Sequence, residues 1–358
     1  MYRLLRFLIA SPAGSFLALA LAVGACASGA LARAPEGFAP LVKKVLPAVV
    51  NIAVTQTLSG ADMYNDLPPE LRDTPLGRQF RRRFGGKQEQ VTGAGSGFIV
   101  DPSGIIVTNN HVVGHADEIL VSLTDGRQFK ARVLGRDELT DIAVIKVVAP
   151  GPLPFVGWGD SRKMEVGDWI IAAGNPFGLG GSVSAGIVSA EGRDLGSGPF
   201  DNFLQIDAPI NPGNSGGPVF NMDGQVIGVT STIVSPTGAS VGIGFAIPSE
   251  TVSAIVGQLL ARGQIERGWL GISVGEIVKG VGLLVASLDR NSPAAKAGIR
   301  PGDVLLAVNG ERVETANGLI RAVATVAPGN NVRITLRRQG RDLDISVTVG
   351  RRPPEQAG

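Results

Sequence analysis

Ser215 is the residue whose surroundings best fit a chemical role. It lies in the segment 211–218 (NPGNSGGP), where glycines stand on both sides of it. Glycine gives the backbone conformations that are closed to other residues and lets a substrate approach closely. A nucleophilic serine needs both, together with free backbone N–H groups that face the oxyanion formed on attack. The segment therefore predicts a serine nucleophile.

A serine hydroxyl becomes a good nucleophile when a neighbouring base, usually histidine, takes its proton. The chain has two histidines, His111 and His115. His111 follows two apolar runs, 97–100 and 105–107, which a turn-like Asp-Pro-Ser-Gly link joins, so we expect it at the end of a strand. His115 lies in a polar stretch and is expected to be a solvated loop residue. His111 is the candidate base, with a solvated histidine as the alternative.

Asp141 is the candidate for the acid that orients this histidine. It precedes the almost wholly apolar run 142–148, which predicts a strand. A carboxylate at the start of such a strand needs a partner, whereas Asp101 and Asp117 have turn or surface contexts. An ordinary turn residue is the alternative interpretation of Asp141.

The glycines around Ser215 also match the G-x-S-x-G nucleophile elbow of α/β-hydrolases. That motif needs a strand-turn-helix around the serine and a histidine after it. No histidine follows Ser215. Residues 218–220 and 225–229 flank a Met-Asp-Gly turn and predict a β-hairpin instead. The elbow therefore fails on residue order and on local structure.

The order His111, Asp141, Ser215 is the chymotrypsin order. The segments that carry these residues closely resemble the HtrA/Deg (Do-like) family of serine endoproteases. Further matches extend the resemblance over about residues 40–350. It implies a mostly β protein, with a chymotrypsin-like double β-barrel protease domain followed by a C-terminal α+β PDZ domain. The matching segments are 108–113 (TNNHVV), 140–144 (TDIAV), 174–178 (GNPFG), 186–189 (GIVS), 213–217 (GNSGG) and 242–248 (GIGFAIP).

The resemblance also implies roles for these residues. Ser215 attacks the scissile carbonyl, His111 transfers the proton to the leaving amine, and Asp141 orients His111. Backbone N–H groups of the segment Gly213, Asn214, Ser215 form the oxyanion hole. We expect no metal, because the sequence shows no cluster of metal-ligating residues. We expect no cofactor, because residues 93–97 (GAGSG) lack the spacing and the lysine of a phosphate-binding loop.

The specificity pocket is predicted to be apolar. In trypsin-like relatives, an aspartate six residues before the serine selects Lys or Arg, and here that position is Pro209. The candidate wall residues are Ile210, Ile233 and Ile243. We therefore expect cleavage after small or medium aliphatic residues such as Val, Ala or Ile.

The N-terminus predicts export. Arg3 and Arg6 precede an uncharged stretch that ends at Ala32, and residues 1–32 fit a cleaved secretory signal peptide. Two alternatives stay open: a lipoprotein signal with Cys26 as the acylated residue, and an uncleaved membrane anchor. All three place the catalytic part in the periplasm. Cys26 is the only cysteine, so the chain has no intrachain disulfide.

The protease domain is expected over 33–248. It contains an insertion at about 56–92, rich in proline and arginine, for which the resemblance implies a regulatory loop and composition alone a solvated one. Arg193 falls in the loop that relays activating signals in the family, with an ordinary surface arginine as the alternative.

A linker helix is expected within 249–267 and acts as the hinge to the next domain. Ser249 is its expected N-cap, and Gly263 its stop. Its apolar stripe consists of Val252, Ile255, Val256 and Leu259.

Residues 268–350 resemble a PDZ domain that adds an extended C-terminal peptide to its sheet. Trp269, Leu270, Gly271 and Ile272 match the family's carboxylate-binding loop, with packing in the domain core as the alternative. The tail 351–358 is expected to be disordered.

The formal net charge of +2 implies no nucleic-acid partner. The resemblance implies an ATP-independent endoprotease acting on unfolded or damaged proteins in periplasmic quality control and the stress response, assembled as a homotrimer or a multiple of it. Two alternatives are a regulatory protease that is gated by its PDZ domain and cleaves one membrane substrate, and a chaperone-like binding protein.

Overall fold

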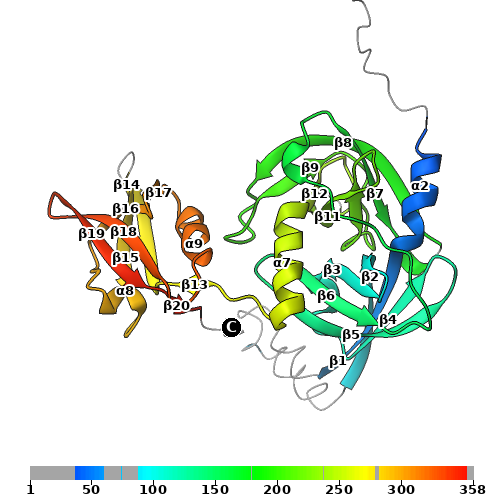
Figure 1. The fold of residues 1–358 in the computed structure, drawn as a ribbon, viewed down its shortest axis with the longest axis horizontal. Helices are drawn as coiled ribbons and strands as arrows, with labels where there is room; N and C mark the ends of the chain where they lie inside the picture. The colour runs from blue at the N-terminus through cyan, green and yellow to red at the C-terminus, as the bar shows by residue number, and fades with distance from the viewer. Residues whose placement is uncertain are drawn as a thin grey trace, which may run out of the picture. The chain divides into compact units, whose positions relative to one another are not determined.

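The structure is a computed structural model that describes residues 37–59, 74, 88–178, 180–236, 238–278 and 282–352 (Figure 1). The predicted signal peptide with Cys26, most of the 56–92 insertion and the residues after 352 lie outside this part of the chain. The chain enters through helix α2 (Ala39–Val45) and a 3-10 turn, η1 (Leu46–Ala48). No helix among the described residues combines the length and the apolar character that a membrane crossing requires.

The first barrel closes six antiparallel strands in the order β1-β2-β3-β6-β5-β4. β-branched side chains fill it, and β6 is buried at five of its six positions, as expected for a strand covered on both faces. The apolar runs 97–100 and 105–107 lie in β2 and β3, which pair across the expected turn, where Gly104 has φ 96°. The strands are β1 (Val49–Ser59), β2 (Gln88–Asp101), β3 (Ile105–Asn109), β4 (Glu118–Leu123), β5 (Gln128–Asp137) and β6 (Ile142–Val147).

The second barrel repeats this order as β10-β11-β12-β9-β8-β7. The predicted hairpin after Ser215 is confirmed as the pair β10 and β11. The mostly β, double-barrel fold expected from the sequence is therefore confirmed. The strands are β7 (Trp169–Gly174), β8 (Ser182–Arg193), β9 (Phe203–Ile206), β10 (Pro218–Phe220), β11 (Val226–Ile233) and β12 (Gly244–Pro248).

Helix α7 (Ser249–Arg262) packs on both barrels, against β5 and β6 of the first and against β11 and β12 of the second (Figure 1). The expected apolar stripe is buried, and Gly263 ends the helix with φ 71°. Ser249 is not the N-cap, because the helix already begins at this residue. Its hydroxyl instead donates to the carbonyl of Gly159 and contacts Ser161. The helix is thus part of the barrel body and not the hinge that the sequence suggested.

The C-terminal domain contains a six-stranded sheet, in which β14-β15-β16-β18-β19 follow in this order and β17 pairs with β16. Helix α9 packs on β16. β14 is an edge strand of this sheet. Ser292 caps α8 by accepting from the Ala295 N–H. The elements are β13 (Gly268–Trp269), β14 (Ile272–Val278), β15 (Gly282–Leu288), α8 (Pro293–Lys296), β16 (Val304–Val308), β17 (Glu311–Arg312), α9 (Ala316–Ala324), β18 (Asn331–Arg338), β19 (Arg341–Thr348) and β20 (Gly350–Arg351).

Two expected boundaries differ from the structure. Arg351 pairs with Gly268 in a short two-stranded sheet, so the ordered chain extends into the expected tail. The expected insertion is shorter than 56–92, because β1 continues to Ser59 and β2 already begins at Gln88. Strand pairing determines both boundaries, and local composition does not reveal that pairing.

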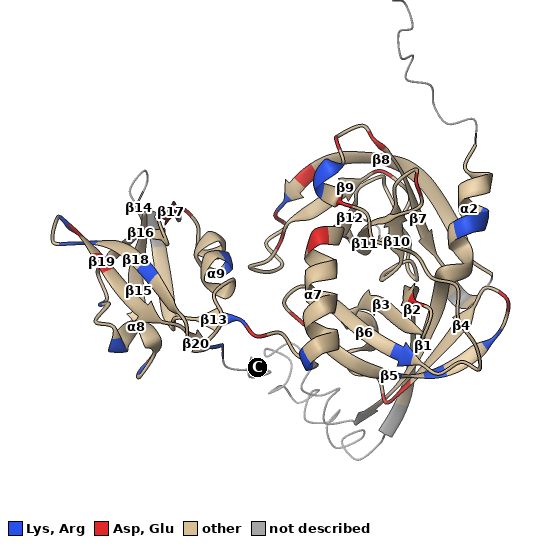
Figure 2. Ribbon diagram, in the orientation of Figure 1, with Lys and Arg blue, Asp and Glu red and all other residues tan. Residues whose placement is uncertain are grey.

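Acidic and basic residues are interspersed along the described elements (Figure 2). This distribution agrees with the small formal charge of the chain.

Candidate active site

The predicted base and acid come from neighbouring strands of the first barrel. His111 lies in a one-turn helix, α6 (Asn110–Val113), directly after β3, and Asp141 precedes β6. β3 and β6 pair so that Asn109 lies opposite Ile142. This register brings the ends of the two strands together and places Asp141 beside His111.

Two contacts join these residues. Asp141 Oδ2 lies 2.7 Å from His111 Nδ1, and Asp141 Oδ1 accepts the His111 backbone N–H at 2.8 Å. The carbonyl of Asp141 accepts from the Asn109 side-chain amide and from the Asn110 N–H. Asp141 has φ 55°, a conformation that is uncommon for a residue with a side chain. The surrounding hydrogen bonds hold this conformation and aim the carboxylate at the imidazole.

Ser215 comes from the second barrel, in the loop between β9 and β10. The Asn214 N–H donates to the Asn211 carbonyl at 3.0 Å, and Gly213 has φ 95°. Pro212 followed by a glycine with positive φ is the sequence of a type II turn. Within the described part of the chain, the N–H groups of Gly213 and Ser215 donate to no protein acceptor. They are therefore free to bind an oxyanion.

Ser231 on β11 is a residue that the sequence analysis missed. Its hydroxyl donates to Asp141 Oδ2 at 3.2 Å, and its carbonyl accepts the Ser215 hydroxyl at 3.4 Å. Among the described residues, no hydrogen bond joins the Ser215 hydroxyl to His111. Catalytic hydrogen bonds are often long before substrate binds. No local pattern marks Ser231, because its contacts depend on how the two barrels meet.

His111 and Ser215 share one pocket of about 350 Å³. Both barrels contribute to it, so a substrate would lie between them. His115, which was expected to be solvated, is exposed and also lines this pocket. The other lining residues are Val54, Gln56, Val91, Gly93, Ala94, Val112, Ala116, Pro212 and Gly213.

The three predicted specificity residues are close in the fold. Ile233 pairs with Gly244, and a Cβ on Gly244 would meet the Ile210 side chain at 3.0 Å. The Ile243 carbonyl accepts the Val234 N–H. Ile210 is buried, Ile233 half-buried and Ile243 exposed. None of the three lines the pocket that His111 and Ser215 share.

Arg193 is the last residue of β8, and its guanidinium donates to Gln205 at 2.9 Å. It therefore stands at the start of the 194–202 loop and not inside it. Asp201 closes this loop by accepting the N–H groups of Leu195 and Ser197. The loop lines a pocket of about 550 Å³ together with His111 and Asp141.

In the C-terminal domain, Trp269 ends β13, and Ile272 begins the edge strand β14. Between them Leu270 is buried, and Gly271 turns with φ 69°. A small pocket of about 60 Å³ forms beside this segment. It is lined by residues 268–272, by Leu319, Ile320 and Val323 of α9, and by Arg352.

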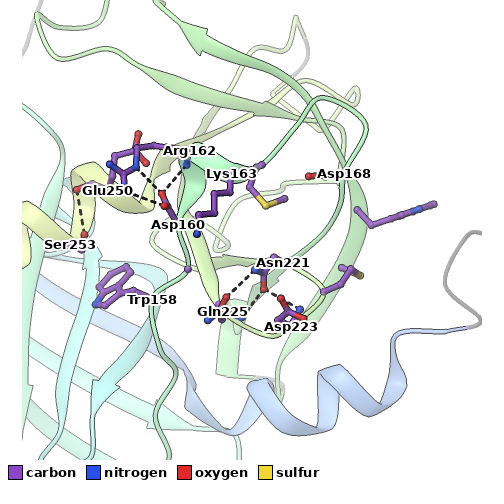
Figure 3. Close-up of a pocket in the computed structure, with 14 residues that line it drawn as sticks. Trp158, Asp160, Arg162, Lys163, Asp168, Asn221, Asp223, Gln225, Glu250 and Ser253 are labelled. Atoms are coloured by element: carbon purple, nitrogen blue, oxygen red, sulfur yellow. Dashed lines mark hydrogen bonds and ion pairs between the residues drawn. The ribbon is translucent and has the colours of Figure 1, made fainter. Parts of the chain in front are cut away.

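A further pocket, of about 880 Å³, contains none of the predicted catalytic residues. It lies between the turn around Asp223, the 3-10 turn η2 (Ser161–Lys163) and the start of α7 (Figure 3). Asp160 and Arg162 point toward each other there and form an ion pair at 2.8 Å. The described residues also hold no group of His, Cys, Asp and Glu side chains suited to a metal ion.

The comparisons with known proteins agree with this architecture. The model of the trypsin-like peptidase domain matches residues 95–229, and that of the PDZ domain matches residues 268–349. A probable periplasmic serine endoprotease, DegP-like, from Brucella suis is 43% identical and covers 89% of this chain and 70% of that protein. The protein of the same name from Halomonas elongata is 40% identical and covers 96% of this chain and 76% of that protein.

Solved structures show the same likeness. The HtrA-type protease AlgW with a decapeptide superposes with a TM-score of 0.75 at 35% identity, covering 89% of this chain and 99% of that one. The serine endoprotease from Yersinia pestis has a TM-score of 0.68 at 32% identity and covers 90% of this chain and 100% of that one. With a trypsin-like double barrel followed by one PDZ domain, this chain belongs to the HtrA/DegP family of trypsin-like serine endoproteases.

Proposed function

We propose that this protein is a periplasmic endoprotease that degrades unfolded or damaged proteins without ATP, with His111, Asp141 and Ser215 as its catalytic triad. One observation carries the proposal: His111, which pairs with Asp141 in one barrel, lines the same pocket as the Ser215 turn of the other barrel. Relatives that are named periplasmic endoproteases support the location.

The geometry supports the following chemistry. The Ser215 oxygen bonds to the scissile carbonyl carbon while its proton passes to His111 Nε2, and the carbonyl electrons move onto the oxygen. The N–H groups of Gly213 and Ser215 stabilise that oxyanion. Collapse breaks the C–N bond, and the amine leaves with the proton from His111. Water then releases the acyl group by the same route, while Asp141 holds the Nδ1–H tautomer throughout.

The cleavage preference proposed is for small or medium aliphatic residues at the bond. The apolar wall of Ile210, Ile233 and Ile243, together with Pro209 at the position where trypsin-like relatives carry an acid, supports it. Mass spectrometry of casein fragments tests this preference. Fragments that end mainly in Lys or Arg would contradict it.

The PDZ domain is proposed to bind C-terminal peptides at residues 269–272. The edge strand β14 is open to an added strand, and the adjoining pocket is lined by aliphatic side chains. A related structure contains a bound decapeptide. The same site supports the second candidate function, a regulatory protease that a peptide activates.

Assembly and anchoring are also proposals. We propose a homotrimer or a multiple of it, on the family resemblance, and sedimentation of the purified protein measures its size. The N-terminus is cleaved after Ala32, lipidated at Cys26 or retained as an anchor. The mass of the native N-terminal peptide distinguishes these three states.

The test of function is degradation of unfolded casein by the purified protein and by its Ser215→Ala variant. Each is assayed with and without a hydrophobic C-terminal peptide. Degradation without peptide, lost on substitution, supports the quality-control protease, whereas degradation only with peptide supports the regulatory one. Suppression of aggregation by both proteins without any proteolysis would overturn the proposal in favour of a chaperone-like protein.

A further inference from the structure

Ser96 is a fully buried serine on β2 of the first barrel that contacts the Ser215 loop of the second. Its N–H donates to the Ser215 carbonyl at 2.8 Å. Its hydroxyl donates to the Gly213 carbonyl at 2.6 Å. One residue therefore holds the carbonyl groups of both residues whose N–H groups are free for the oxyanion.

The direction of the Ser96 hydroxyl is determined by its other contact. Its oxygen accepts the Asn175 N–H at 2.8 Å, so its own hydrogen is left to point at Gly213. The Ser96 carbonyl accepts the Thr108 hydroxyl at 2.7 Å, which ties the residue to β3. The contacts with Asn175 and Thr108 thus fix the position of Ser96, and Ser96 in turn fixes the loop.

The loop has little room to move by itself. A Cβ on Gly213 would lie 2.8 Å from Pro176, and one on Gly216 would lie 2.3 Å from the Ser96 carbonyl oxygen. Packing at this density excludes other side chains, but it does not orient a peptide group. Orientation requires directional contacts, and hydrogen bonds supply them.

We propose that Ser96 is a positioning residue that preorganises the oxyanion hole, by fixing Gly213 and Ser215 so that their N–H groups face the substrate carbonyl. This inference rests on the proposed function. Preorganised donors act on the transition state and not on the bound substrate. Loss of the Ser96 hydroxyl should therefore reduce kcat and leave KM nearly unchanged.

The experiment compares Ser96→Ala with the parent protein on a peptide substrate, with rates normalised to folded protein. We expect kcat to fall about 10- to 100-fold and KM to change less than about twofold, because a small misplacement of catalytic groups has effects of this size. A peptide boronate that forms a tetrahedral adduct on Ser215 should bind more weakly by the same factor as kcat/KM. Binding of the cleaved product peptide should not change.

Ser161→Ala is the matched control. Ser161 is also a buried serine with a hydrogen-bonded hydroxyl, but it contacts Ser249 at the start of α7 and lies outside the pocket of Ser215. We expect it to lower the melting temperature without changing kcat. If Ser96→Ala behaves in the same way, the positioning role is wrong.

A second variant keeps the test decisive if Ser96→Ala does not fold. Ser96→Cys keeps a side chain of similar shape with a much weaker donor, and its kcat should also fall while KM holds. A parent protein that cleaves nothing would refute the proposed function itself. A cleaving parent whose kcat survives in the cysteine variant would refute only the role of Ser96.

Discussion

The carboxylate of Asp141 has more partners than a turn aspartate needs. One oxygen binds the His111 ring and the Ser231 hydroxyl, and the other accepts the His111 N–H. The positive φ of Asp141 is held in place by bonds to its own carbonyl. Strain that the surroundings maintain in this way is typical of functional sites.

Asp141→Asn should therefore impair catalysis far more than stability. The amide has nearly the shape of the carboxylate, but it favours the wrong imidazole tautomer and cannot stabilise the imidazolium. We expect kcat to fall about 10⁴-fold, the magnitude typical of such triads. Steady-state kinetics and a melting curve measure both effects. Asp125→Asn, in an exposed turn pair with Arg127, is the control and should retain full activity.

Ser231 and Ser96 mark the limit of prediction from sequence at this scale. His111, Asp141 and Ser215 stand in local patterns that can be recognised without the fold, and the structure brings His111 and Asp141 to 2.7 Å. Ser231 and Ser96 are ordinary strand residues in sequence. Their contacts arise only where strands from two barrels meet.

Among the elements, the edge strand β14 begins at a glycine turn with no room for a side chain. A Cβ on Gly271 would lie 2.4 Å from Ser292 and 2.9 Å from the Trp269 ring. Gly271→Ala should therefore distort the loop and weaken binding of a C-terminal peptide more than tenfold, as fluorescence anisotropy would measure. Gly340→Ala is the control, because Gly340 also has positive φ but open space around it. Equal affinities of the two variants would contradict a binding role for this loop.

The turn that leads into β16 is held by an ion pair between the buried Asp303 and the partly buried Arg338. Asp303 accepts two hydrogen bonds from Arg338, both at 2.7 Å, and one from the Arg300 N–H. Burial by itself raises the pKa of the Asp303 carboxyl, but Arg338 and the Arg300 N–H outweigh it and hold the pKa below its ordinary value. The stabilisation is complete above the pKa of the unfolded carboxyl, near 3.9. It is lost as the pH falls through the lower folded pKa.

Asp303→Asn should then destabilise the PDZ domain by about 2 kcal/mol at pH 7, the usual scale for hydrogen bonds to a charged group. The difference from the parent should shrink as the pH falls below about 4. Hydrogen exchange over residues 268–352 measures it at each pH. Asp342→Asn, which breaks the exposed pair with Arg337, should change little. A destabilisation that persists undiminished in acid would rule out the ion pair as its cause.

Helix α7 shows how far an amphipathic pattern predicts an element. Its stripe and its glycine stop follow from sequence, since burial of one face and a left-handed end are local requirements. The position of Ser249 does not follow from sequence, because its hydroxyl hydrogen-bonds to Gly159 and Ser161. Strand pairing likewise extends β1, β2 and β20 beyond the boundaries that composition suggests.

Over the whole protease domain, the proposed active site requires that the two barrels stay together, because the proposed base and acid belong to one barrel and the proposed nucleophile to the other. Ser96 of the first barrel hydrogen-bonds to Gly213 of the second, and α7 packs on both barrels. Leu259, buried at 1% exposure on α7, would lie 3.0 Å from a Cβ on Gly135 of β5. It is therefore a contact between the helix and the first barrel.

Leu259→Ala should destabilise the protease domain by about 2–5 kcal/mol through the lost burial and the cavity left behind. Leu260→Ala is its neighbour-matched control, since Leu260 is 47% exposed and should change stability by less than about 0.5 kcal/mol. Because α7 packs on both barrels, we expect casein cleavage and hydrogen-exchange protection of both barrels to be lost together on heating the Leu259 variant. Loss of protection in the first barrel while the second stays protected would show that the helix does not couple them.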